Sequence, residues 1–521
     1  MLAAGASLLA APVGHSSARL KTGGVFRAAF TGASVTVDPQ IAWVTTAWWL
    51  EYATAAKLYN YPDKSGYEGA LLRPEVASGY TVSNNGKSYI FTIRKGFRFS
   101  DGEPVTAENF AYAIKRALSF GWPAGDFIRD ENGTYIASYK ARGNKLIIRL
   151  KEADGTFMSK ITLPFFQATS TRLKLNKEIE SVSGNSYPSA GPYYYAKNEV
   201  DKLTQVRKNP YWKPGPGRHR PRNLDGVDIT WSVNENTGFL QTLDNEYDLG
   251  PLPAANVQQI ARRFGVNRTR FWVKPNPCTG FVAFNNIRGP FAHNPELRKA
   301  VSWALNRTDY VKQAGWYAGR PWTHFLPPGM PGSIEKRIYG AKPDLGKAKT
   351  LDGGYPENGG RLVLAYFGSG STNSNQAQVV RRDLIRLGFD PHQIIMRGYS
   401  GSMVSDPFLD PQATWDLFSG AGWCAEYPDP AAFFNLLTEP YVFRVASRKY
   451  RRKIFAAGKL IGDARMKAFG ELDLEIMRNA APLAAMRTYN NRYFFSNRVD
   501  PRSLVYQGVY SDWSIPALAL K

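Results

Sequence analysis

The order of elements predicted between residues 361 and 419 restricts the fold most strongly. Apolar runs at 361–366, 392–397 and 415–419 predict three strands, and the periodicity of 375–387 predicts a helix between the first two. A helix that joins two strands implies a parallel pair with a right-handed crossover. Ligands of such open α/β sheets bind outside the carboxyl ends of the strands. A binding site is therefore expected directly after the last strand, at 420–426.

This segment changes abruptly in character. It begins with three small residues, Gly420 to Gly422. The indole of Trp423, the thiol of Cys424 and the carboxylate of Glu426 follow within four positions. Small residues let a ligand backbone approach closely, and a carboxylate in a cleft would receive the positive end of a ligand. An alternative is that Glu426 caps a turn or pairs with a structural arginine. The binding residues predicted here are Ala421, Gly422, Trp423, Cys424 and Glu426, with Gly420 ahead of them.

Length and charge limit the class of protein. A chain of 521 residues is too long for one core, so two or three domains are expected. The net charge of +23 would attract nucleic acid, anionic lipid or anionic wall polymers. The basic runs are short and no nucleic-acid-reading motif accompanies them. A solvated basic surface is expected, with no nucleic-acid partner.

The N-terminal residues indicate export. Residues 2–13 are apolar and rich in alanine, and small residues follow, which resembles a secretory signal without its basic start. Residues 1–21 are therefore predicted to be a partial signal segment, and the protein to be extracytoplasmic. Cys278 and Cys424 are the only two cysteines. In an exported protein such a pair favours a disulfide; two buried free thiols are the alternative.

Residues 79–118 are predicted to be scaffold. Alternating apolar residues on both sides of Asn84-Asn85-Gly86-Lys87 predict a β-hairpin. Thr106 is expected to cap a helix whose apolar side chains lie on one face.

A family resemblance rests on motifs that recur in order along the chain. The first three, around the hairpin and the helix that follows, carry it most clearly, and the resemblance spans the chain from about residue 22 to its end. The chain resembles the family 5 extracellular solute-binding proteins, which are the peptide- and nickel-binding components of ABC importers. The motifs lie at 72–77, 85–96, 99–110, 190–193, 207–212, 284–285, 290–300 and 423–430.

The resemblance implies a fold. It predicts a two-lobed α/β protein of the type II periplasmic-binding-protein kind with an additional inserted domain. Lobe one would combine 22–50, 176–277 and 494–521, the insert would be 51–175, and lobe two 278–493. The lobes would close around a ligand like a hinge.

The resemblance also implies a function. Peptide-binding members hold an extended peptide between the lobes and deliver it to a membrane permease that has its own ATPases. An acidic residue shortly after a Trp-Cys pair receives the peptide's α-ammonium; the matching residue here is Glu426, where Asp is more usual. On the opposite lobe the pattern places Trp43 and Val44 near the ligand. Cysteines at 278 and 424 resemble the oligopeptide-binding branch, and a monomer without cofactor or metal is expected.

Other functions stay open at this point. The same family fold could hold a sugar, an opine, nickel or haem, because fold does not determine ligand. Glu426 and Asp429 could be the carboxylate pair of a secreted hydrolase, whose separation would determine the mechanism. A basic protein that binds wall polymer or nucleic acid is a further rival. The sequence lacks the common motifs for nucleophiles and catalytic metals, so a binding protein is expected rather than an enzyme.

Overall fold

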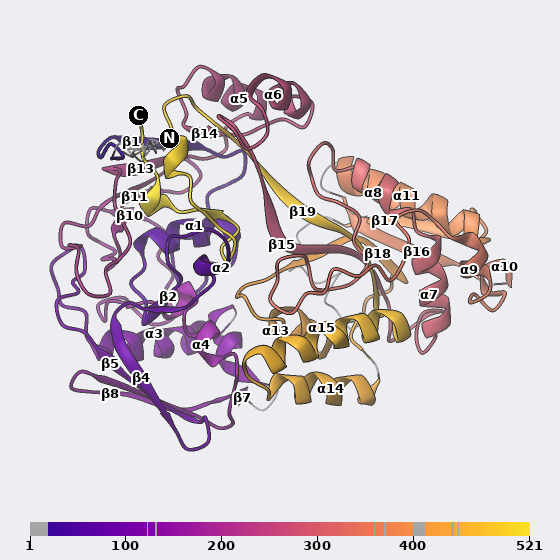
Figure 1. Cartoon of the computed structure of the whole chain (residues 1–521), viewed down its shortest axis with the longest axis horizontal. Coiled ribbons are helices and arrows are strands. Elements are labelled where there is room, and N and C mark those ends of the chain that lie inside the picture. The colour runs from indigo at the N-terminus through magenta and orange to yellow at the C-terminus, as the bar shows by residue number, and fades with distance from the viewer. Residues whose placement is uncertain are drawn as a thin grey trace, which may run out of the picture.

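Two α/β bodies are joined by long strands in a computed structural model of the chain (Figure 1). The structure describes residues 19–121, 123–130, 133–358, 360–368, 371–399, 412–438, 442–445 and 447–521. Most of the predicted signal segment, 1–18, lies outside the described residues.

One large mixed sheet runs through both bodies. Its eleven described strands lie in the order β10-β11-β12-β13-β1-β14-β19-β15-β18-β16-β17. In chain order they are β1 (Val25–Ala29), β10 (Val182–Ser183), β11 (Tyr193–Glu199), β12 (Leu203–Lys208), β13 (Gly226–Thr230), β14 (Leu249–Gly250), β15 (Phe271–Phe284), β16 (Leu362–Phe367), β17 (Ile394–Tyr399), β18 (Leu417–Cys424) and β19 (Leu483–Phe495).

The strands β15 and β19 connect the two bodies. They pair antiparallel from Phe271 opposite Phe494 to Ala283 opposite Leu483, and they run diagonally between the bodies in Figure 1. The lobe boundaries predicted at 277/278 and 493/494 fall inside these two strands. Two paired strands that connect two bodies in this way can act as a hinge, because a change in their twist tilts one body relative to the other.

A smaller antiparallel sheet, in the order β4-β5-β9-β8, lies in the part of the chain predicted as the insert. The predicted hairpin is confirmed: Asn84 and Asn85 have φ of 56° and 51°, as a tight turn between two strands requires. Its strands and the helix beside them are β4 (Ala77–Ser83), β5 (Ser88–Ile93), β8 (Ile136–Arg142), β9 (Lys145–Leu150) and α3 (Ala107–Phe120). The domain boundaries at 51 and 175 stay a prediction.

The strand order predicted for 361–419 is confirmed, but its last strand is longer than expected. Strands β17 and β18 both pair with β16 in parallel. The parallel pairing ends at Ser419, yet β18 continues to Cys424 beside β15. Gly420 makes this possible: it has φ of 85° and lies in a bulge where the register to β15 shifts. The small residues therefore continue the strand instead of following it.

Helices cover both bodies. Asn294 accepts a hydrogen bond from Leu297 N at the start of α7 (Pro295–Ala304). The other helices of interest are α1 (Thr45–Thr54), α5 (Glu235–Leu243), α8 (Arg307–Lys312), α11 (Ser371–Leu387), α13 (Ala431–Thr438), α14 (Arg448–Gly458) and α15 (Gly462–Asn479).

The largest apolar core includes residues of both bodies. Buried Phe91 and Phe110 of the smaller sheet and its helix belong to the same cluster as Phe281 and Phe433 of lobe two. Separate cores fill lobe one, around Trp231, and the far side of lobe two. The insert and lobe two therefore meet across an apolar contact, next to the predicted site.

Candidate functional site

The segment 420–426 lies where the hinge strands enter lobe two. After its bulge, β18 pairs with β15 so that Trp423 lies opposite Thr279 and Cys424 opposite Cys278. The two cysteines form a disulfide, as predicted, across 146 residues of sequence. Cys424 is exposed and Cys278 is buried. Ala425 N also donates to Pro277 O, which extends the pairing to the residue before Glu426.

Glu426 is buried, and none of the described residues is a charged partner for its side chain. Its side chain forms no ion pair with any residue that the structure describes, and the residue is 8% exposed. Loss of solvent raises the pKa of Glu426 to about 8, and a hydrogen bond from its own backbone N–H opposes this only in part. A buried carboxyl without a counter-ion is costly when ionised. Burial therefore favours the neutral, protonated form of Glu426.

The structural role considered for Glu426 belongs to Asp429 instead. Arg465 donates to both oxygens of Asp429, from Nε at 2.9 Å and from Nη2 at 2.8 Å. Asp429 Oδ1 also accepts from Ala431 N at the start of α13. This occupied carboxylate is a poor acid or base, so the arrangement does not favour a hydrolase that pairs Glu426 with Asp429.

The residues between the bulge and Glu426 have structural partners. Trp423 Nε1 donates to Ala432 O at 2.9 Å, which fixes the indole against α13. Ala421 is buried in the largest core. A Cβ on Gly422 would lie 2.8 Å from Tyr489 Oη, so this glycine makes room for a tyrosine of β19. Its predicted contact with a ligand backbone stays a prediction.

Trp43 belongs to an aromatic cluster that reaches the residue after Glu426, and its predicted contact with a ligand stays a prediction. Its ring stacks on Phe165 with centroids 6.2 Å apart and lies 5.6 Å from Phe127. Phe127 is in turn 6.5 Å from the ring of Tyr427, the neighbour of Glu426. An aromatic wall thus runs from Trp43 to Tyr427. Val44 directly precedes α1 and is 50% exposed.

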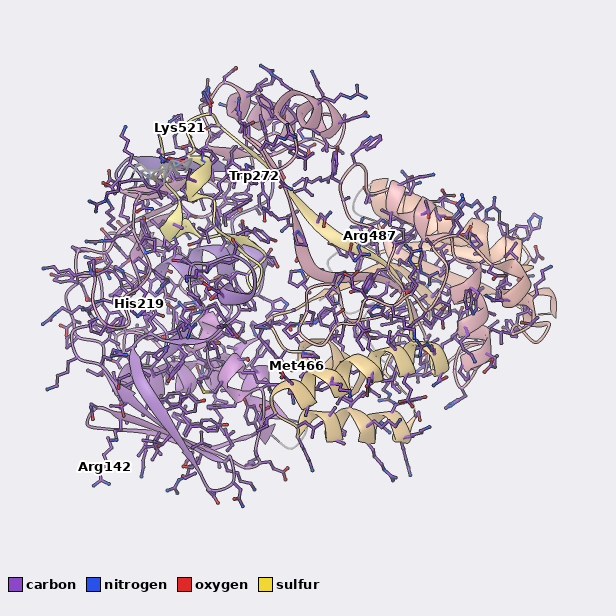
Figure 2. All side chains as sticks on the ribbon, viewed as in Figure 1. Arg142, His219, Trp272, Met466, Arg487 and Lys521 are labelled. Carbon is purple, nitrogen blue, oxygen red and sulfur yellow. A yellow bond between two sulfur atoms is a disulfide. The ribbon has the colours of Figure 1, made fainter. Side chains whose placement is uncertain are left out.

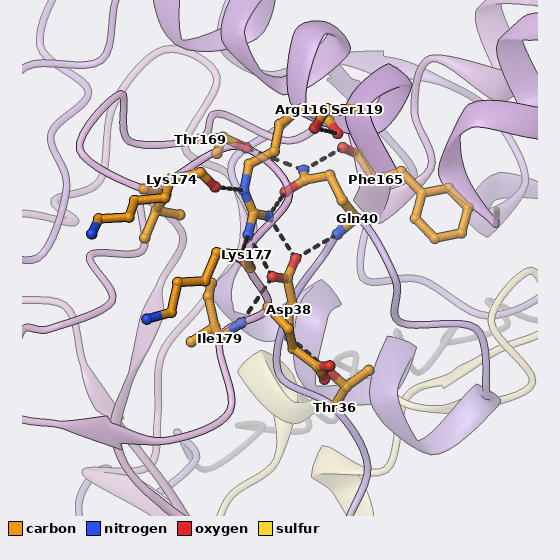
Figure 3. A network of polar contacts seen from close by, with 12 residues as sticks. Thr36, Asp38, Gln40, Arg116, Ser119, Phe165, Thr169, Lys174, Lys177 and Ile179 are labelled. Atoms are coloured by element: carbon orange, nitrogen blue, oxygen red, sulfur yellow. Dashed lines mark hydrogen bonds and ion pairs between the residues drawn. The ribbon is translucent and has the colours of Figure 1, made fainter. Parts of the chain in front are cut away.

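A buried ion pair fixes the chain that carries Trp43 (Figure 3). Arg116 of α3 and Asp38 are both inaccessible to solvent, and Nη2 lies 2.6 Å from Oδ2. Arg116 also donates to Gln40, whose amide donates to Phe165 O at 2.8 Å. Because Phe165 stacks on Trp43, this network ties the insert to the aromatic wall.

Arg487 of β19 was not predicted from the sequence. It is 9% exposed, and its Nη1 has no hydrogen-bond partner among the described residues. The guanidinium lies 4.0 Å from the centroid of the Tyr489 ring, and a Cβ on Gly280 would lie 3.0 Å from Arg487 Cγ. Figure 2 shows Arg487 where the hinge strands reach lobe two. A charged residue that ends the apolar run 483–486 was the available signal.

Tyr489 connects Arg487 to the predicted segment. Its hydroxyl lies against Gly422 of β18, while its ring lies under the Arg487 guanidinium. Glu426 thus lies four residues beyond the point of β18 against which Tyr489 and Arg487 pack.

A separate hollow in lobe one contains none of the predicted site residues. It lies between α1 and the C-terminal residues and is lined in part by Tyr52, Asp63, Arg220 and Tyr510. It does not contact Glu426, so we do not assign the predicted site to it.

The described residues contain no group of three or more side chains suited to a metal ion. No described helix is both long enough and apolar enough to cross a membrane.

Comparisons with known proteins agree with this geometry. The dipeptide-binding protein DppE of Bacillus subtilis is 24% identical over 457 residues, which cover 82% of this chain and 80% of DppE. The structure titled clavulanic acid biosynthesis oligopeptide binding protein 2 superposes with a TM-score of 0.83 at 20% identity and 96% coverage of both chains. NikA of Staphylococcus aureus, in complex with Ni(L-His)2, gives a TM-score of 0.71 at 15% identity, covering 96% of this chain and all of NikA.

These likenesses confirm the predicted two-lobed fold of type II periplasmic binding proteins. The model of the bacterial extracellular solute-binding proteins, family 5 Middle, matches residues 72–443. This match covers more than half of the chain and includes the motifs on which the resemblance rested, most of the predicted insert and the Glu426 segment. The chain therefore belongs to the family 5 bacterial extracellular solute-binding proteins.

Proposed function

We propose that this protein captures oligopeptides outside the cytoplasm and delivers them to the membrane permease of an ABC importer. It would act as an exported monomer and would not transform its ligand. The observation that carries the proposal is the buried, unpaired carboxyl of Glu426 beside the contact between the insert and lobe two. DppE, whose name states that it binds dipeptides, supports the same class of ligand.

The α-ammonium of a peptide would be a counter-ion for the Glu426 carboxylate. A hydrogen bond to a charged group contributes about 1.5 to 3 kcal/mol. The ammonium would also compensate the ionised carboxylate that burial disfavours. Recognition of this kind selects a free amine and does not depend on the side chains of the peptide.

Arg487 would bind the carboxylate at the opposite end of the peptide. A guanidinium binds a carboxylate through two parallel hydrogen bonds, and Nη1 of Arg487 has a donor available for one. A ligand with a cation at one end and an anion at the other fits both groups at once. A peptide has this charge pattern, whereas a neutral sugar would provide no ammonium for Glu426 and no carboxylate for Arg487.

The aromatic residues beside Glu426 suit a ligand with variable side chains. The exposed backbone edge of an extended segment offers hydrogen bonds that every peptide can make. The aromatic wall of Trp43, Phe127 and Tyr427 offers apolar area without a fixed polar pattern.

Calorimetric titration with matched peptides tests both ends. Glu426→Gln should weaken a free-amine peptide by about tenfold or more and leave its N-acetylated form nearly unchanged. Arg487→Gln should weaken a free-carboxylate peptide but hardly affect its C-terminal amide. The exposed residues Glu471 and Arg478 of α15 provide control substitutions to Gln, which should change neither affinity.

If Glu426→Gln weakens binding of the free-amine and N-acetylated peptides equally, Glu426 does not bind the ammonium. If Arg487→Gln weakens binding of the free-carboxylate and amide peptides equally, Arg487 does not bind the carboxylate. Tight binding of a sugar, an opine or a metal complex with no peptide binding would replace the oligopeptide by that non-peptide ligand.

A further inference from the structure

We propose that the outer face of α14 and the turn after it bind an anionic membrane surface. The patch consists of Phe455, Leu460 and Ile461 together with the basic side chains around them. In Figure 1, α14 lies at the outer edge of lobe two beside α15 and away from the hinge strands. The proposal does not depend on the identity of the ligand in the cleft.

The apolar side chains of the patch are not the ones that pack α14 against lobe two. Tyr450, Ile454 and Ala457 are buried and attach α14 to lobe two. On the other side Phe455 is 61% exposed, and Ile461 is 79% exposed. Leu460 between them is 40% exposed. Scattered surface apolar residues are ordinary, but three large ones within seven positions at one corner of the protein form a patch.

The patch has a strongly positive surround. Residues 447–461 contain six basic and no acidic side chains. Lys453 pairs with Glu475 of α15 at 2.6 Å. No described carboxylate forms an ion pair with the other five, of which four are exposed: Arg448, Lys449, Arg452 and Lys459.

These charges do not serve the helix itself. Arg448 and Lys449 lie in the first turn of α14, where the macrodipole favours acidic side chains and disfavours cations. Ser447, which precedes the helix, provides no side-chain capping hydrogen bond. The basic residues thus reduce the local stability of α14, which indicates that they complement something outside the chain.

An anionic bilayer matches both components at once. Interfacial helices bury aromatic and aliphatic side chains at the boundary of the acyl chains, while Lys and Arg contact the headgroups. Each cation near an anionic surface contributes about fivefold in affinity. An acidic protein surface would complement the cations but would leave the protruding Ile461 and Phe455 in need of a fitted apolar pocket.

Co-sedimentation of the full chain with vesicles tests the proposal. The protein should bind vesicles of phosphatidylcholine mixed with phosphatidylglycerol, bind phosphatidylcholine alone far more weakly, and lose binding as salt rises. The double variant Phe455→Ser/Ile461→Ser should bind about tenfold or more weakly. Arg448→Gln/Arg452→Gln should bind about 25-fold more weakly, since two charges are removed.

The matched control is Leu240→Ser on α5 of lobe one, where Leu240 is 55% exposed. This variant should bind vesicles like the unchanged protein. Failure of the unchanged protein to bind anionic vesicles would overturn the proposal, as would equal binding to both vesicle types or an equal loss in all variants. Self-association that requires Phe455 and Ile461, without vesicle binding, would assign the patch to a second copy and also overturn it. Lipid and salt dependence are measured on the unchanged protein, so a variant that misfolds does not prevent the test.

Discussion

Peptide binding should depend on pH because Glu426 must give up a proton before it can pair with an ammonium. The pKa of the buried Glu426 in the free protein is raised to about 8 by loss of solvent. A bound ammonium stabilises the ionised form and lowers this pKa. Below pH 8 the free protein therefore holds a proton that the complex does not.

The magnitude follows from the two ionisations. The fraction of Glu426 that is ionised rises about ninefold from pH 6 to pH 7, given its pKa of about 8. The peptide's α-amino group, with a pKa of about 7.7 to 8.0, loses its charge above that range. Affinity should therefore increase about eightfold from pH 6 to pH 7, reach a maximum near pH 8, and fall at higher pH.

Titration calorimetry of a peptide without ionisable side chains measures this directly. Near pH 7, binding should release about 0.8 proton, because Glu426 gives up about 0.9 proton and the peptide's α-amino group takes up about 0.1. The released protons are counted by repeating the titration in buffers of different ionisation enthalpy. In Glu426→Gln the release and the acidic limb should both disappear. A pH-independent affinity below pH 8, or an unchanged proton release in the Gln variant, would refute the reasoning.

Three further predictions concern stability. The pKa of Glu426 is higher in the folded than in the unfolded protein, so this group lowers the stability progressively as pH rises from about 4.5 to 8. Glu426→Gln should therefore raise the free energy of unfolding by about 4 kcal/mol near pH 8 and hardly at all near pH 4. Urea unfolding at both pH values checks this, and an equal gain at both would contradict it. Arg116→Met leaves buried Asp38 unpaired and should cost about 3 to 5 kcal/mol, whereas a loss under about 1 kcal/mol would show that the pair is dispensable. Replacing Cys278 and Cys424 by Ser removes a closure of 146 residues and should cost about 5 kcal/mol of unfolding free energy; an unchanged denaturation midpoint would argue against this.

Features set by local sequence were predictable. The hairpin at Asn84 and Asn85 needs two residues that tolerate positive φ, and the sequence provides them at the turn itself. The strands and helix of 361–419 follow from periodicity, and the crossover rule then gives their parallel pairing. The position of Glu426 beyond the parallel edge follows from the same rule.

Features set by distant contacts were not predictable. Nothing near Asp429 in sequence indicates that Arg465, 36 residues away, would occupy its carboxylate. The extension of β18 past Ser419 depends on a bulge at Gly420 and on an available edge of β15. Arg487 becomes notable only because packing leaves its Nη1 without a partner, and packing across three strands is invisible in a single sequence.

The continuous sheet has a consequence for ligand capture. Because β15 and β19 belong to both lobes, a change in their twist would move the insert and lobe two relative to each other. The aromatic contact between Phe127 and Tyr427 lies beside Glu426 and would open in such a motion. Access to the buried carboxyl is thus coupled to lobe opening.

Native mass spectrometry of the freshly purified protein identifies the bound ligand. Co-purified ligands should dissociate on activation and fragment as peptides with free N-termini. The same preparation of Glu426→Gln should carry much less of this peptide. A bound sugar, opine or metal complex in place of peptide would contradict the account, and so would peptides with blocked N-termini.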